Sequence, residues 1–192
     1  VETVRKIVRA AGELGLEALS LYAFSSENWK RPEDEISDLM GLMREFIKSD
    51  LDEFAANNVR LKIIGNYKAL APDIVDMLEE SIARTSQNTR TTLAVALNYG
   101  SQDELVRAAR SAAAQGDITA ESIEAHLDTA GLPSLDLLIR TSGEQRLSNF
   151  MLWQAAYAEF WFTDTLWPDF SKDELAQALT EFSTRERRYG GR

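Results

Sequence analysis

Two arginines stand six residues apart in a polar loop near the carboxyl end of the chain. Arg140 and Arg146 follow the apolar run 135–139, which has the length of a buried strand, and Ser148 lies two residues further on. A helix-like segment, 150–158, comes next. A strand, a polar loop and a helix in this order build anion sites in α/β proteins, because free N–H groups and guanidinium forks bind phosphate oxygens. The loop is therefore predicted to bind a phosphate.

A carboxylate follows the helix-like segment. Glu159 begins a second apolar run, 160–162, and is a candidate ligand for the Mg²⁺ that often accompanies a diphosphate. The alternative is that Arg140 and Arg146 pair with surface carboxylates, because the chain holds 31 Asp and Glu residues. The residues by themselves therefore indicate a phosphate-handling α/β loop and no particular substrate.

The stretch 140–150, with the sequence RTSGEQRLSNF, resembles the signature of the cis-prenyltransferases, in particular the bacterial undecaprenyl diphosphate synthases. The segments 153–154, 157–159 and 167–170 match as well. The resemblance implies an enzyme that condenses isopentenyl diphosphate repeatedly onto an allylic diphosphate, farnesyl diphosphate. Its product would be undecaprenyl diphosphate, the precursor of the lipid carrier for cell-wall synthesis.

The resemblance also assigns roles to single residues of this stretch. Arg140, Arg146 and Ser148 would bind the diphosphate of isopentenyl diphosphate. Glu159 would hold Mg²⁺ together with an aspartate that the family carries in an Asp-Gly-Asn loop. No Asp-Gly-Asn occurs in the 192 residues, which begin at Val1 inside a helical pattern. The chain by itself is therefore expected to be inactive, and a non-catalytic partner subunit is an alternative. A cis-prenyltransferase of different product length is another.

A second polar loop, 25–31, follows the apolar run 16–24 and is closed by Pro32. Ser-Glu-Asn-Trp-x-Arg-Pro is the second signature of the family. By the resemblance, Asn28 would support proton transfer in catalysis, and further residues of the loop would shape both substrate sites: Ser25, Trp29 and Arg31. The charged run after the proline makes the loop a candidate lid. The alternative is a capped turn with an anchoring tryptophan.

A growing hydrocarbon needs a long apolar cavity that excludes water. By the resemblance, four residues on predicted strands would line such a tunnel: Leu16, Ala23, Val59 and Leu93. The alternative is that all four are ordinary core residues.

Strand-like runs alternate with helical patterns along the whole chain. Helices are predicted over 1–14, 33–56, 72–83, 102–114, 118–130 and 172–187, and strands over 16–24, 59–64, 93–97 and 135–139. This alternation predicts an α/β fold with a mostly parallel sheet flanked by helices on both faces. The length indicates one domain, 1–192, lacking the first strand and the Asp-Gly-Asn loop of the family.

Composition narrows the partners and the compartment. The net charge of −10 argues against nucleic acid, because neutralising its backbone needs a basic face. The chain has no cysteine, which fits a reducing cytoplasm, and no apolar stretch has the length of a membrane span. We therefore expect a cytoplasmic enzyme. A peripheral position at the inner face of the membrane is the alternative, because the product lipid is delivered to the membrane.

The region 150–167 holds more large aromatic residues than a short helix and a strand usually bury, and aromatic residues are enriched at interface cores. Family members are dimers built on this region, so a homodimer is expected. Arg188 and Gly190 match an Arg-x-Gly element that reaches across the dimer to the isopentenyl diphosphate of the partner in some members. The alternative is an ordinary basic tail.

Overall fold

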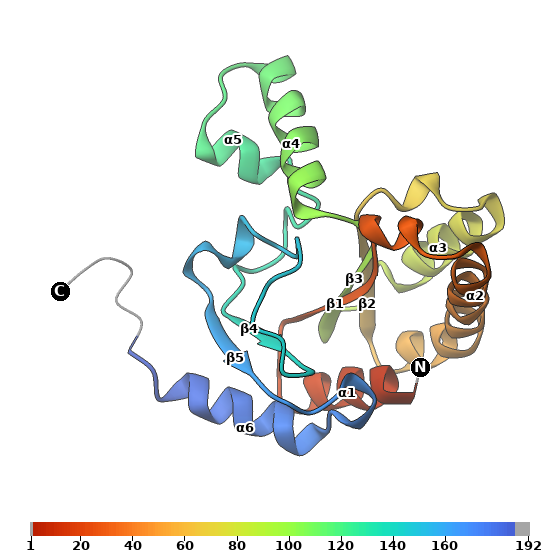
Figure 1. The fold of residues 1–192 in the computed structure, drawn as a ribbon, viewed down its shortest axis with the longest axis vertical. Coiled ribbons are helices and arrows are strands. Elements are labelled where there is room, and N and C mark those ends of the chain that lie inside the picture. Colours follow the sequence, from red (N-terminus) through yellow and green to blue (C-terminus); the bar gives the residue numbers. More distant parts are fainter. Residues whose placement is uncertain (1, 187–192) are drawn as a thin grey trace.

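The computed structural model of the chain describes residues 2–186, with the side chain of residue 51 left aside, and helices alternate with strands along it (Figure 1). The first half contains α1 (Glu2–Glu13), β1 (Ala18–Ser25), α2 (Glu33–Ala56), β2 (Val59–Ile64), α3 (Pro72–Thr85) and β3 (Thr91–Tyr99). The second half contains α4 (Ser101–Gln115), α5 (Ala120–Ala125), β4 (Leu137–Arg140), β5 (Glu159–Phe162) and α6 (Lys172–Ser183).

Every strand pair of the described residues is parallel. One sheet has the order β1-β3-β2, and β4 pairs with β5 in a second sheet. Among residues 2–186, β1 and β4 are therefore each paired on one side only. The predicted α/β fold with parallel strands and flanking helices is confirmed, although the strands form two short sheets.

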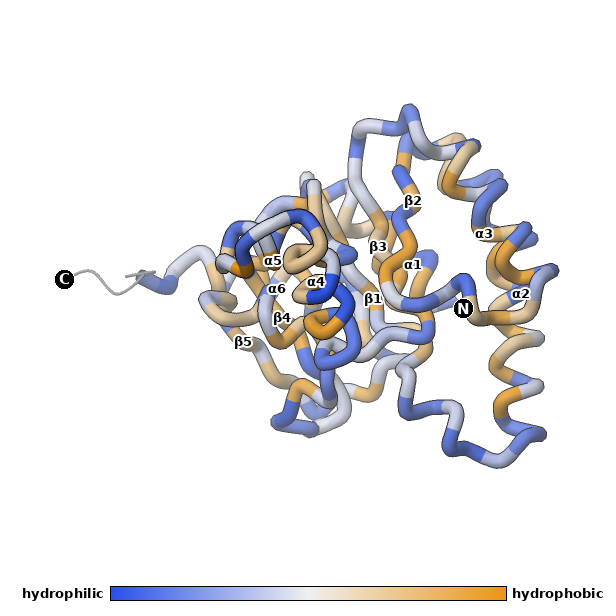
Figure 2. Tube along the Cα trace, turned by 90° about the horizontal axis from the view of Figure 1, so that it is seen from above, coloured by the Kyte–Doolittle hydropathy of each residue, from blue (hydrophilic) through white to orange (hydrophobic). Residues whose placement is uncertain are grey.

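The main core lies between the three-stranded sheet and the helices α2 and α3. Residues of β2 alternate between hydrophobic and polar along most of the strand, so one face packs on this core (Figure 2). Phe54 of α2, Leu78 of α3 and Leu93 of β3 are buried members of this cluster. A second cluster joins α1 and α6 to the second sheet through Ile7, Trp161 and Leu175. The helices thus cover both sheets from different sides, as Figure 1 shows.

The predicted helix 150–158 does not form. The segment is instead a series of turns that ends in a 3₁₀ helix, Gln154–Tyr157. Its backbone explains the difference, because Ser148, Asn149 and Met151 have φ angles of 49°, 62° and 49°. Side-chain-bearing residues rarely adopt this left-handed region, and it cannot continue a right-handed helix. The predicted helix 118–130 is likewise shorter, as α5.

A buried carboxyl group fastens the α4–α5 hairpin, which projects from the rest of the molecule (Figure 1). Glu104 of α4 is fully buried. Its Oε2 accepts hydrogen bonds from the Tyr99 hydroxyl (2.5 Å) and from Gln154 Nε2 (3.2 Å), and its Oε1 accepts one from Asp128 N (2.9 Å). Because a buried polar group without partners is costly, these contacts hold β3, the segment after α5 and the segment before β5 together.

Replacing Tyr99 by Phe should lower the free energy of unfolding by about 1.5–3 kcal/mol, because Glu104 loses one charge-assisted hydrogen bond in the interior. Tyr67→Phe is a matched control, since the Tyr67 hydroxyl donates to Glu79 (2.9 Å) at the surface, where changes usually stay within about 0.5 kcal/mol. Urea unfolding of both variants measures the difference. Equal losses would contradict the role given to Glu104.

Candidate functional site

The two polar loops singled out from the sequence begin at strand ends. Ser25 is the last residue of β1 and Arg140 is the last residue of β4. Both loops lie around Tyr22: burial and the charge of Glu27 together raise the pKa of the Tyr22 hydroxyl to about 12, although Ser25 and Arg140 act in the opposite direction. Open parallel sheets bind ligands at the carboxyl ends of their strands. The structure therefore brings the two loops to one place, as a shared site requires.

Arg140 has a buried hydrogen-bond donor without a partner. No other side chain that the structure describes in this site has one. The Nε of Arg140 is buried and has no hydrogen-bond partner among residues 2–186. Nearly all buried polar groups in native proteins are satisfied, so an exception calls for a ligand or another explanation. A guanidinium forks toward two oxygens of a carboxylate or phosphate. Arg140 is thus available to an anion that enters from the cavity it lines.

The loop after β4 is tied down at its start. Ser142 N donates to Thr165 O and Gly143 N donates to Thr163 O, both at 2.9 Å. Arg146 lies further along, with its side chain 64% exposed, and forms an ion pair with Glu144. This is the pairing that the alternative interpretation expected of surface arginines. Ser148 is exposed. An anion would therefore have to replace Glu144 as the partner of Arg146.

The loop after β1 forms a 3₁₀ turn, Ser26–Lys30. Asn28 Oδ1 accepts a hydrogen bond from Ser25 N (2.7 Å), which caps the turn. Trp29 packs edge-on against Phe24, and its Nε1 donates to Asn98 Oδ1 (2.8 Å). These contacts are those of the capped turn with an anchoring tryptophan.

Arg31 of the same loop pairs with Glu35 at 3.3 Å, and both side chains are half exposed. An exposed pair of this kind contributes little to stability. Arg31 can therefore exchange its partner for an anion at small cost. The roles of Ser25, Asn28, Trp29 and Arg31 in binding and catalysis stay predictions.

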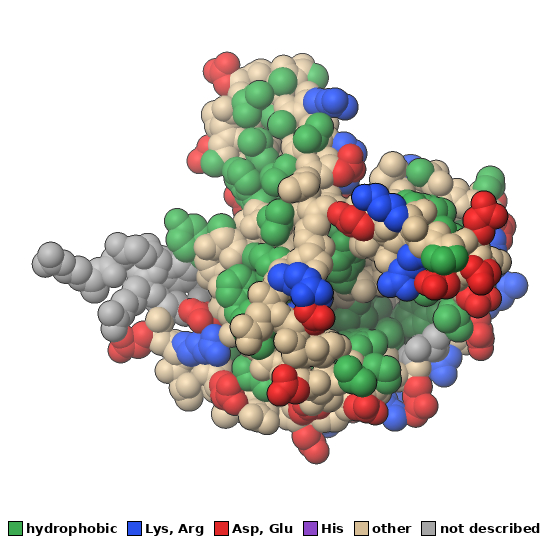
Figure 3. All heavy atoms as spheres, viewed as in Figure 1, with side chains coloured by type: hydrophobic (Ala, Val, Ile, Leu, Met, Phe, Trp, Pro, Cys, Tyr) green, Lys and Arg blue, Asp and Glu red, His purple; other side chains and the backbone are tan. Residues whose placement is uncertain are grey.

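A cavity of about 1870 Å³ lies between α2, β1 and the second sheet. Figure 3 shows a hollow lined by hydrophobic side chains, with cationic side chains near it. Leu16 and Ala23 line the cavity, and Ala23 lies where the register of β1 shifts between Tyr22 and Phe24. Val59 and Leu93 do not line it and are 4% and 0% exposed in the core. The structure thus joins two of the four predicted tunnel residues to the cavity.

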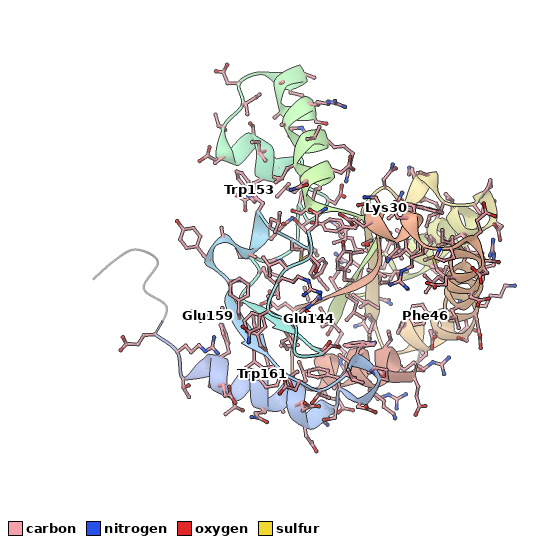
Figure 4. All side chains as sticks on the ribbon, in the orientation of Figure 1. Lys30, Phe46, Glu144, Trp153, Glu159 and Trp161 are labelled. Atoms are coloured by element: carbon pink, nitrogen blue, oxygen red, sulfur yellow. The ribbon has the colours of Figure 1, made fainter. Side chains whose placement is uncertain are left out.

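Sequence reasoning missed most of the cavity wall, although a signal was present. Residues of α2 supply much of it, including Leu39, Met43 and Phe46, and Figure 4 places Phe46 on that helix. The helical periodicity of α2 marks these residues as apolar but cannot tell a core from a cavity. α6 adds Leu179 and Phe182.

Glu159 lies at the amino end of β5, opposite Leu137, while Arg140 lies at the other end of β4. Its Oε2 accepts a hydrogen bond from Arg185 Nη1 (2.9 Å), and about a third of each side chain is exposed. Figure 4 shows Glu144 and Glu159 on different segments, the loop after β4 and the strand β5. The described residues contain no group of three or more potential metal-binding side chains. The described residues therefore contain no complete Mg²⁺ site, and the metal-binding role of Glu159 stays a prediction.

The predicted Arg-x-Gly element, with Arg188 and Gly190, lies outside the described residues. Within residues 2–186, none of the helices combines the length and the apolar character that a bilayer crossing requires.

Comparison with known proteins gives the family. The family model described as "Putative undecaprenyl diphosphate synthase" matches residues 1–190. The isoprenyl transferase of Agrobacterium fabrum is 53% identical, and the alignment covers 99% of this chain and 80% of that protein.

Two solved structures share the fold. A probable undecaprenyl diphosphate synthase from Campylobacter jejuni has a TM-score of 0.90 and 36% identity, covering 98% of this chain and 90% of the other. Lavandulyl diphosphate synthase from Lavandula x intermedia, in complex with dimethylallyl diphosphate, has a TM-score of 0.94 and 34% identity, covering 98% and 85%. The cationic loop, the apolar cavity and these matches lead to one conclusion: the chain belongs to the undecaprenyl diphosphate synthase family of prenyltransferases.

Proposed function

We propose that this chain condenses isopentenyl diphosphate repeatedly onto farnesyl diphosphate and so makes undecaprenyl diphosphate. The observation that carries the proposal is the position of Arg140. A guanidinium Nε that is buried and has no partner among residues 2–186 borders a cavity whose walls are mostly apolar. The diphosphate of isopentenyl diphosphate satisfies the guanidinium, and the hydrocarbon that condensation joins to it occupies the cavity.

The size of the cavity favours a long hydrocarbon. Pockets for small ligands usually measure roughly 300–1,000 Å³, and this cavity measures about 1870 Å³. The lavandulyl diphosphate synthase neighbour shows that the fold also serves other products. A cis-prenyltransferase of different product length is therefore the alternative within the class.

Prenyl transfer requires a bound leaving diphosphate, two reactants in fixed orientation and a dry channel for the chain. We assign the diphosphate of isopentenyl diphosphate to Arg140, Arg146 and Ser148, with Arg146 exchanging Glu144 for the ligand. In the loop after β1, we assign Asn28 to proton transfer and further residues to substrate binding: Ser25, Trp29 and Arg31.

We also propose Mg²⁺ as the cofactor, with Glu159 as one ligand. Diphosphate oxygens are hard ligands of the kind Mg²⁺ prefers. The described residues supply no complete ligand set, so the remaining carboxylate has to come from elsewhere, as the Asp-Gly-Asn loop of the family would provide it. No Asp-Gly-Asn occurs in the 192 residues. These 192 residues alone should therefore bind isopentenyl diphosphate without turning it over. The location in the cytoplasm and the delivery of the product to the membrane stay predictions.

The first test is binding of isopentenyl diphosphate, measured by calorimetry on the 192-residue chain. Arg140→Ala should raise the Kd about 10- to 150-fold, because a charge-assisted contact contributes roughly 1.5–3 kcal/mol. Arg140→Lys keeps the positive charge but loses the forked guanidinium group, so its Kd should lie between those of the wild type and Arg140→Ala. The melting temperature should hardly change, since the buried Nε of Arg140 has no hydrogen-bond partner among residues 2–186.

Arg44→Ala is the matched control, because Arg44 pairs with Asp73 at 2.6 Å on the helices α2 and α3. Its Kd should equal that of the wild type. An unchanged Kd in Arg140→Ala would sink the assignment of the diphosphate site. Absence of binding by the wild type would remove the proposed function itself.

The second test uses the complete encoded protein with radiolabelled isopentenyl diphosphate and farnesyl diphosphate. The product should co-migrate with undecaprenyl diphosphate; a shorter or longer polyprenol would select the alternative, and a protein without turnover would favour a non-catalytic partner subunit. Glu159→Gln should raise the Mg²⁺ concentration needed for turnover. Because Gln can still accept from Arg185, the melting temperature should hold; a lower melting temperature with an unchanged metal titration would make Glu159 structural.

We further propose a homodimer that uses the outer face of β5. Phe160 and Phe162 lie on one face of the strand and are 37% and 42% exposed, while Trp161 on the other face is buried. Tyr157, which precedes the strand, is 70% exposed. Exposed aromatic residues gathered in this way are typical of interface cores. We propose that Arg188 reaches the isopentenyl diphosphate site of the partner.

Mixing two inactive variants of the complete protein tests this arrangement. If Arg188 acts in the partner's site, a dimer of Arg188→Ala with Asn28→Ala has one site with both defects and one with neither. Activity should then partly return, as measured by incorporation of labelled isopentenyl diphosphate. Affinity-tag capture shows whether subunits exchange. If they exchange and activity does not recover, Arg188 acts within its own subunit or does not contact the site at all.

A further inference from the structure

One amide side chain joins three segments at the carboxyl edge of the sheets. Asn149 lies at the end of the phosphate-binding loop, directly after Ser148. Its Nδ2 donates a hydrogen bond to Glu27 Oε1 (2.8 Å) in the loop after β1. Its Oδ1 accepts one from Gln102 N (2.9 Å), and its backbone oxygen accepts one from Ser101 N (2.8 Å), both in the first turn of α4.

These contacts make Asn149 the cap of a helix to which it does not belong. The first N–H groups of a helix lack partners within the helix and are usually capped by the residue before it. In α4 that residue is Gly100, which has no side chain to offer. Asn149 replaces the missing cap from a position 47 residues away along the chain. The loop and the start of α4 are therefore fixed relative to each other.

Gly100 leaves the space that Asn149 needs. A Cβ atom at position 100 would lie 2.5 Å from Ser26 Oγ and 2.7 Å from Asn149 Nδ2. Both distances are shorter than van der Waals contact allows, so a side chain there would displace the side chains of Ser26 and Asn149. The loop after β1, the start of α4 and the phosphate-binding loop consequently pack closely around Gly100.

The hydrogen bond between Asn149 and Glu27 requires the Asn149 amide to donate and the Glu27 carboxylate to accept. A carboxylate accepts and cannot donate, so it needs the NH₂ group of the amide, which in turn directs Oδ1 toward Gln102 N. The hydrogen bond from Asn149 lowers the pKa of Glu27, with burial working against it. An acid at position 149 would set two carboxylates against each other.

We propose that Asn149 is a positioning residue for the diphosphate of isopentenyl diphosphate. It holds the end of the loop against α4 and Glu27, so that Ser148 and Arg146 are presented to the ligand beside Arg140. A loop that is already ordered loses less conformational entropy when the ligand binds. The inference rests on the proposed function, since it concerns the same diphosphate.

Exchanging donor and acceptor between positions 149 and 27 tests the hydrogen bond between Asn149 and Glu27. Asn149→Asp still accepts from Gln102 N, and a negative charge suits the start of a helix, so α4 should stay capped. The carboxylate would repel Glu27, and the Kd of isopentenyl diphosphate, measured by calorimetry, should rise about tenfold. Adding Glu27→Gln should return the Kd toward that of the wild type, because the Gln amide can donate to the new carboxylate at position 149. In the complete protein the KM should follow the Kd while kcat changes little.

Asn57→Asp is the control, because Asn57 is an exposed amide that donates to Glu53 O (2.8 Å) at the end of α2. Its Kd should not change. A Kd in Asn149→Asp equal to that of the wild type, or no recovery in the double variant, would overturn the positioning role while leaving the proposed function intact. Absence of binding by the wild type would overturn both.

If Asn149→Asp does not fold, Glu27→Ala removes the same contact from the other side. It leaves Asn149 Oδ1 on Gln102 N, so α4 stays capped, and the Kd should again rise about tenfold. An unchanged Kd in Glu27→Ala would overturn the positioning role.

Discussion

Parallel pairing of the strands is the constraint on which the site depends. Strands that run in one direction end at one edge, so the segments that leave β1, β3 and β4 begin close together. Stacking of Phe150 on Tyr22, with ring centres 4.5 Å apart, fastens the end of the loop after β4 to β1. The contacts among these segments are mostly amide and hydroxyl hydrogen bonds, which fix direction as well as distance.

An acidic protein that binds an acidic ligand has to resolve a conflict of charge. The net charge of −10 repels diphosphates at long range, so attraction has to come from cations close by. Most described arginines are engaged by carboxylates, as Arg5, Arg44, Arg84, Arg107 and Arg185 illustrate. Arg140 stands apart because its buried Nε has no hydrogen-bond partner among residues 2–186. This Nε is therefore open to an oxygen atom of an anion that enters the cavity.

The sequence predicted the regular elements well where local pattern and burial agree. The bounds of α2 and β2 match the predicted 33–56 and 59–64, because an apolar stripe of helical period and an alternating strand each point to one core. The predicted helix 150–158 is wrong because Ser148, Asn149 and Met151 are left-handed at its start, and Asn149 contacts α4, which lies far away along the chain. The family signature singled out the loop after β4. It could not show that Arg146 pairs with Glu144, whereas the Nε of Arg140 has no partner among residues 2–186. It also could not separate a cavity wall from a core, as Ala23 and Val59 show.

The glycine between β3 and α4 limits which sequences this fold can accept. At Gly100 even a methyl group would collide with the side chains of Ser26 and Asn149, and at Gly65, which follows β2, a Cβ would lie 2.3 Å from Leu97 O. Neighbouring strand ends are therefore closed to side chains, whereas the cavity wall formed by Leu39, Met43 and Phe46 has open space in front of it. Substitutions on α2 can accordingly change the shape of the cavity, one residue at a time, without disturbing the carboxyl edge of the strands.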